Sequence, residues 1–158
     1  MTHTAAEYDG LARRLRVLED KEALRALLVR GWRALDHKDW RTWSECWAED
    51  AVLDFGPWGR TRGKEAIREK VEEAESSFPA MQHHLLNTHF DVAGDRAIGI
   101  GYMWFVAVTA PSRASSPYSM GGPYDWEFRR SPEGGWLLVS QRLGVWWTDG
   151  EDGPGAFG

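Results

Sequence analysis

A chain of 158 residues, 42% hydrophobic and 27% charged, has the size and balance of a single globular domain over 1–158. The formal net charge of −5 argues against nucleic acid as a partner, and the only cysteine, Cys46, excludes a disulfide framework and a cysteine metal centre. No apolar run approaches the roughly 20 residues that span a bilayer, and 1–4 lack a signal pattern, so we expect a cytoplasmic protein with no membrane partner.

Helical spacing dominates the first part of the chain. Leucines recur every three or four residues through 8–18 and again through 21–36, and Asp20 is predicted to cap the second segment. Asp39 is predicted to cap a third helix over 40–48, with tryptophans on one side. We expect residues 1–7, ahead of these helices, to form a loose tail.

The pattern changes after Asp50. A short strand is predicted over 51–55, and a Gly-Pro turn leads to a second one over 60–62. A charged amphipathic helix follows, from Lys64 to about Ser76.

The remaining chain is predicted to form sheet. Four long strands are expected, over 81–93, 97–109, 118–130 and 136–148. Gly94 and Asp95 suit a hairpin turn between the first two, and 111–117, rich in serine, is predicted as a loop. The tail, 149–158, holds four glycines and is expected to be loose.

Helices followed by long antiparallel strands indicate the α+β class. We expect a cone-shaped, curved, mixed or antiparallel β-sheet, with the N-terminal helices packed on its concave side. Such a cone encloses an apolar cavity.

Asp36 occupies an unusual position at the end of the second helical segment. The helix dipole disfavours a carboxylate at a C-terminus by a few tenths of a kcal/mol. Its spacing from Trp32 and Leu35 places it beside the apolar stripe. From position alone, Asp36 is either solvated at a fraying helix end or held near a cavity.

A histidine pair opens the strand at 81–93. Alternate strand residues share a face, so His83 and Asn87 are expected on one face and His84 on the other. A cavity-lining histidine bonded to a carboxylate has a fixed tautomer and raised basicity, which suits a general base. The alternative, an ordinary sheet residue, is preferred for His84 and His89. Because His83 and His84 face opposite ways they cannot chelate one ion together, and we expect no metal and no cofactor.

Several short motifs occur here in combination: Asp36 with Lys38-Asp39-Trp40, Trp47-Ala48-Glu49-Asp50-Ala51, Gly63-Lys64-Glu65-Ala66-Ile67, Gln82-His83 and Gly135-Trp136. Over about residues 10–148 the chain resembles the SnoaL-like branch of the nuclear transport factor two-like superfamily. Within it, the chain is similar to scytalone dehydratase, bile acid 7-alpha-dehydratase and lindane dehydrochlorinase. The resemblance implies a curved-sheet cone, a trimer or dimer, and a proton-abstracting Asp–His dyad made of Asp36 and His83.

The chain also departs from these enzymes. Scytalone dehydratase-like enzymes carry a tyrosine before the aspartate, where this chain has Leu35, and a second histidine where it has Met103 or Trp104. These differences argue against the scytalone reaction itself. Lindane dehydrochlorinase-like enzymes use an arginine late in the sheet, for which Arg142 is favoured over Arg129.

Aromatic residues are abundant and include ten tryptophans, more than a core of this size needs. Large rings line pockets well, although core packing is the alternative for each of them. The predicted substrate-binding residues are Trp40, Trp58, Asn87, Trp104, Tyr118, Tyr124, Trp126 and Arg142. Tyr118 and Tyr124 would donate hydrogen bonds to a substrate oxygen, and Asn87 would polarise a carbonyl or hold a leaving hydroxyl.

These features suggest a cofactor-independent lyase. His83, paired with Asp36, would remove a proton next to an activating group on a small hydrophobic cyclic or aromatic molecule, and a leaving group such as hydroxide would depart. A polyketide cyclase or isomerase would use the same base, and a non-catalytic ligand-binding cone is a third possibility. Both faces of the long strands are apolar, so we also expect a homo-oligomer.

Overall fold

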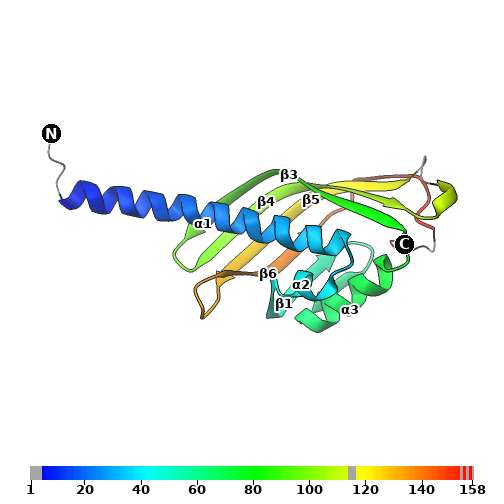
Figure 1. Cartoon of the computed structure of the whole chain (residues 1–158), viewed down its shortest axis with the longest axis horizontal. Helices are drawn as coiled ribbons and strands as arrows, with labels where there is room; N and C mark the ends of the chain where they lie inside the picture. The colour runs from blue at the N-terminus through cyan, green and yellow to red at the C-terminus, as the bar shows by residue number, and fades with distance from the viewer. Residues whose placement is uncertain (1–4, 114–116, 154, 156, 158) are drawn as a thin grey trace.

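The computed structural model describes residues 5–113, 117–153, 155 and 157. Of the expected loose tail at 1–7, residues 1–4 lie outside the described residues, and 5–7 belong to a helix instead. The middle of the serine-rich loop, 114–116, also lies outside the described residues. A long helix lies across one side of a curved sheet, and two short helices stand beside its C-terminal end (Figure 1). No helix in the described part of the chain has the length and apolar character needed to cross a membrane.

Seven strands form one mixed sheet. Its order is β2 (Gly59–Arg62), β1 (Trp47–Phe55), β6 (Trp136–Leu143), β5 (Tyr118–Arg130), β4 (Arg96–Val108) and β3 (Ala80–Ala93), and β7 (Trp147–Asp149) also pairs with β5. β1 runs parallel to β6, and every other pair is antiparallel. A 3-10 turn, η1 (Pro111–Arg113), follows β4. The expected α+β cone is therefore confirmed.

The N-terminal helix α1 (Ala5–Asp36) is continuous, so the predicted break at Asp20 is wrong. Asp20 is buried and caps nothing. Both of its carboxylate oxygens accept hydrogen bonds from Arg130 Nη2 at 2.7 Å, and Oδ1 accepts a third from Trp136 Nε1 at 3.2 Å. Partners on distant strands satisfy this carboxylate, and the helix continues past it.

Two further boundaries differ from the prediction. Helix α2 (Trp40–Ser44) is short because Trp47 already begins β1, whereas the sequence predicted helix to 48 and a strand from 51. Helix α3 (Lys64–Glu75) ends as expected, with Ser76 at its C-cap. The last predicted strand, 136–148, divides into β6 and β7, and β7 pairs with a different part of β5.

Burial along β4 shows which side of the sheet faces the core. Buried and exposed residues alternate strictly from Arg96 to Phe105. Met103 and Phe105 point into the concave side, and Tyr102 and Trp104 point outward. In β3 the alternation is interrupted between Leu86 and His89, where a bulge shifts the register and Asn87 has a φ of 52°.

Candidate active site

Asp36 and His83 form a closely bonded pair. The Nδ1 atom of His83 lies 2.7 Å from Asp36 Oδ1, and its backbone N–H donates to Oδ1 at 3.0 Å and Oδ2 at 3.2 Å. A carboxylate only accepts hydrogen bonds, so we assign a proton to Nδ1. That leaves Nε2 directed away from Asp36. The His83 side chain is only 5% exposed, so this nitrogen faces the interior.

Local structure explains why Asp36 reaches this place. It is the last residue of α1, and the preceding Leu35 is buried in the core. Lys38 then adopts a positive φ of 60°, which turns the chain towards α2. The carboxylate at this helix end accepts hydrogen bonds from two donors at the start of β3, the backbone N–H and the Nδ1–H of His83. Those donors offset the unfavourable helix dipole.

Glu75 is a third charged residue at the site, and the sequence prediction missed it. It is the last residue of α3 and is 4% exposed. Its Oε1 atom lies 3.7 Å from His83 Nε2, and its Oε2 atom is buried with no hydrogen-bond partner in the described structure. His83 thus lies between two carboxylates that come from the ends of two helices.

These surroundings change the acidity of two side chains. Burial by itself lowers the pKa of His83, but the carboxylates of Glu75 and Asp36 outweigh it and raise that pKa to about 9. Burial raises the pKa of Tyr124 well above its usual value, so its phenol stays protonated. Trp32 Nε1 donates to the Tyr124 hydroxyl at 3.2 Å, which leaves the phenol proton free to be donated.

An apolar cavity adjoins the pair. Its walls are mainly aromatic and aliphatic, and its polar members are Glu75, His83, Tyr124 and Gln141. Trp43 also lines it, and its buried indole N–H has no hydrogen-bond partner among the described residues. The cavity volume is about 40 Å³, which is room for a few water molecules.

Phe157 explains why this volume is small. Its ring is 7% exposed and lines the cavity. It contacts the rings of Phe55, Trp58, Phe78, Phe105 and Tyr118 at centroid distances of 5.4–6.2 Å. The Phe157 backbone N–H also donates to Asp152 at 3.0 Å. The expectation of a loose tail over 149–158 therefore does not hold at Phe157.

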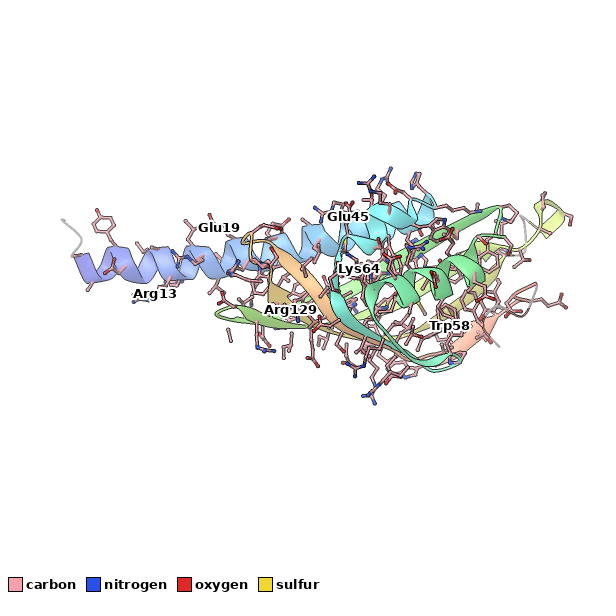
Figure 2. All side chains as sticks on the ribbon, turned by 90° about the horizontal axis from the view of Figure 1, so that it is seen from below. Arg13, Glu19, Glu45, Trp58, Lys64 and Arg129 are labelled. Atoms are coloured by element: carbon pink, nitrogen blue, oxygen red, sulfur yellow. The ribbon has the colours of Figure 1, made fainter. Side chains whose placement is uncertain are left out.

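Several residues predicted to bind substrate lie at or near this cavity. Trp58 and Tyr124 line it, and Tyr118 stacks on Phe157 beside it. Figure 2 places Trp58 in the half of the molecule away from the N-terminal end of α1. Trp126 stacks on Tyr124 and donates to Gln141 Oε1 at 2.9 Å, so it supports two lining residues without lining the cavity itself.

Four other predicted residues point elsewhere. Trp104 is 47% exposed on the outer face of β4, where it packs on His84, and the inward neighbour is Met103. Trp40 borders a surface groove between α2 and α3. Neither ring lines the cavity, so these positions argue against the predicted substrate-binding roles of Trp104 and Trp40.

The predicted roles of Arg142 and Asn87 also disagree with their positions. Arg142 is exposed beside Asp54 and Asp125, because its inward neighbours on β6 are Gln141 and Leu143. Asn87 is exposed because the bulge in β3 removes it from the face that His83 occupies. The alternative arginine, Arg129, is paired with Asp50 at 2.6 Å on the surface.

A signal for Glu75 was present in the sequence. Ile67, Val71 and Glu75 recur every four residues and share the buried face of α3. An acidic residue therefore occupies a position where the helical period calls for an apolar one. The same irregularity singled out Asp36, and it would have found Glu75 as well.

Comparisons with known proteins place this geometry in a family. Residues 16–142 match the SnoaL-like domain. An NTF2-like protein with a cystatin-like fold from Novosphingobium aromaticivorans is 26% identical, with 86% of this chain and 88% of that one covered and a TM-score of 0.70. A comparison with curated proteins finds no match.

Two solved structures named as candidate dehydratases share the fold at lower identity. One, a candidate scytalone dehydratase from Novosphingobium aromaticivorans, is 18% identical over 91% of this chain and 92% of that one, with a TM-score of 0.72. The other, from the NTF2-like family of Streptomyces avermitilis, is 18% identical over 82% and 97%, with a TM-score of 0.66. Because the family match spans most of the chain and the fold agrees, this protein belongs to the SnoaL-like domain family of the NTF2-like superfamily.

Proposed function

We propose that this protein is a cofactor-independent lyase that removes water, or a similar small leaving group, from a hydrophobic cyclic or aromatic molecule. The Asp36–His83 pair is its general base. The observation that carries the proposal is the 2.7 Å contact between Asp36 Oδ1 and His83 Nδ1, which leaves Nε2 facing the interior beside an aromatic cavity. The SnoaL-like family and the dehydratase names of two fold neighbours support this class of reaction.

The chemistry needs few groups. In the form that acts as a base, His83 is neutral and carries its proton on Nδ1, where it is hydrogen-bonded to Asp36. The lone pair of His83 Nε2 can then accept a proton from carbon. The apolar walls exclude water from the carbanion-like transition state and strengthen each electrostatic contact. Tyr124, protonated throughout the working pH range, is a donor for a substrate carbonyl oxygen.

Substrate entry requires the cavity to enlarge. A volume of about 40 Å³ is far below the few hundred Å³ typical of small-molecule sites. The Phe157 ring fills the space between Trp58, Tyr118 and Phe78, at interplanar angles of 20°, 10° and 29°. A flat ring matches this stacked space, so an aromatic or cyclic substrate that displaces Phe157 would recover the same contacts.

The test is turnover of cyclic and aromatic β-hydroxy ketones, whose dehydration gives an absorbing enone. We expect the native protein to accelerate dehydration, and we expect His83→Ala and Asp36→Asn to lower kcat/KM by about 100-fold or more. His84→Ala is the matched control, because this neighbouring histidine packs on the outer face of the sheet.

Mass spectrometry of the product separates the related reactions, since a dehydratase product has lost the mass of one water and an isomerase product has not. Full activity in correctly folded His83→Ala would show that the pair is not the base. Binding of the ketones without any turnover would favour the non-catalytic ligand-binding alternative.

A further inference from the structure

Glu75 is buried where a carboxylate is hard to accommodate. It follows Ile67 and Val71 on the apolar face of α3, and its Oε2 atom has no hydrogen-bond partner in the described structure. A buried polar atom without a partner destabilises the folded state. The C-terminal end of α3 adds an unfavourable dipole. A leucine here would complete the apolar stripe without these costs, so the carboxylate calls for an explanation other than packing.

The position of Glu75 supplies one. It lines the cavity together with His83, and its Oε1 atom is 3.7 Å from His83 Nε2. The groups that can titrate around His83 are Asp36 from α1, Glu75 from α3 and Tyr124 from β5. Asp36 holds Nδ1–H and Tyr124 keeps its own proton, so one exchangeable proton remains between His83 Nε2 and Glu75.

That proton gives two forms of the pair. In one, His83 is an imidazolium and Glu75 a carboxylate. In the other, His83 is neutral with a free Nε2 lone pair, and Glu75 is a neutral carboxylic acid. The second form places no net charge on either group in an apolar cavity, and it sets a base and an acid side by side.

We propose that Glu75 is the general acid of this site and protonates the leaving oxygen while His83 removes the proton from carbon. This inference rests on the proposed lyase function and supplies the group that function still lacks. Hydroxide is a poor leaving group, so a dehydratase needs an acid as well as a base.

The proton balance closes within the site. His83 Nε2 takes the proton from carbon, and the electron pair of the C–H bond forms the double bond. The C–O bond breaks, its electron pair stays on oxygen, and oxygen receives the Glu75 proton and leaves as water. His83 is then an imidazolium and Glu75 a carboxylate. Transfer of one proton from Nε2 to Glu75 converts this imidazolium–carboxylate form back into the neutral form that reacts.

Leaving groups distinguish an acid from a base. The two probes are a β-hydroxy-β-phenyl ketone, which must lose hydroxide, and the corresponding β-nitrophenoxy ketone, whose leaving group needs no proton. We expect Glu75→Gln to lower kcat/KM for the hydroxy ketone by about 100-fold or more and to change it less than about fivefold for the nitrophenoxy ketone. His83→Ala should lose both reactions.

Glu73→Gln is the matched control, because it removes the same charge from an exposed position on the same helix. Circular dichroism checks the fold of each variant. Equal losses on both probes in Glu75→Gln, or no loss on either, would overturn the general-acid role while leaving the base assignment in place. No turnover of either probe by the native protein would overturn the proposed function, and the role of Glu75 with it.

Discussion

His83 derives its properties from two carboxylates that end two helices. Asp36 closes α1 and Glu75 closes α3, and the imidazole between them relieves both unfavourable helix-end charges. Because the folded pKa of His83, about 9, lies above its ordinary 6.5, the protonated form favours the folded state. This stabilisation is fully present below about pH 6.5 and is lost as the pH rises through about 9.

The same titration predicts the alkaline limit of activity. Acid and base catalysis together require the one proton that His83 and Glu75 share. Above about pH 9 the pair loses this proton, so no acid is left for the leaving oxygen. We therefore expect kcat/KM for hydroxy ketones to fall as the pH rises through about 9, as measured in a pH series with the native protein.

Local patterns in the sequence drew attention to Asp36 and His83, and the family resemblance implied that the two form a dyad. Asp36 is a carboxylate at the C-terminal end of a helix, where the helix dipole disfavours it, and His83 lies near the start of a strand whose alternation can be read. Asn87 could not be placed in the same way, because the bulge in β3 depends on pairing with β4. The role of Arg142 came from the resemblance, whereas its exposure follows from strand parity, because its neighbours Gln141 and Leu143 face inward.

At the scale of elements, α1 is fixed to the sheet by Asp20. This carboxylate bonds Arg130 and Trp136, more than a hundred residues away in the chain. The sequence pattern predicts a helix cap at Asp20 because it shows only the neighbours of this residue in the chain. Arg130 and Trp136 are too far away in sequence to be recognised as its partners. By contrast, β5 matched its prediction from Tyr118 to Arg130, since the alternation that places Tyr124, Trp126 and Phe128 on one face is a local property.

Removal of the Asp20 carboxylate should destabilise the fold. Asp20→Ala leaves the partly buried Arg130 with only the exposed Asp95 as an ion-pair partner, and it also removes the acceptor of the Trp136 N–H. We expect a loss of about 2 kcal/mol, below the 3–5 kcal/mol of a fully buried pair because both side chains keep some exposure. The thermal midpoint should fall by about 4–8 °C in scanning calorimetry.

Glu19→Ala is the control for this change, since Glu19 is an exposed neighbour on the same helix. Its midpoint should shift by less than about 2 °C, as surface substitutions usually do. A native-like midpoint for Asp20→Ala would mean that apolar packing alone fixes α1 to the sheet.

At the scale of the whole molecule, the first half of α1 extends beyond the sheet, away from the candidate active site (Figures 1 and 2). Leu11, Leu15 and Leu18 lie on one side of it and are 51–64% exposed. The outer face of β4 adds Ile98 and Ile100, both more than half exposed. A projecting helix with an uncovered leucine stripe is only marginally stable in water. We therefore propose that a second copy of the chain covers this stripe.

The oligomer is tested by light scattering at micromolar concentration. We expect a dimer or trimer for the native protein and a smaller species when Leu11 and Leu15 are both changed to glutamate. Arg13→Glu is the control, because Arg13 lies about 200° around the helix from Leu11. A native protein that is already a monomer would contradict the proposal.

His83 lies between two carboxylates, and we infer that it shares a proton with one of them, Glu75. The most direct measurement is a nitrogen-15 NMR titration of the His83 ring in the native protein, Asp36→Asn and Glu75→Gln. We predict an imidazolium at pH 7 with an apparent pKa of about 9 in the native protein and a lower pKa in both variants. A native His83 whose pKa is at or below 6.5, and whose pKa does not change in Glu75→Gln, would contradict a proton shared between His83 and Glu75.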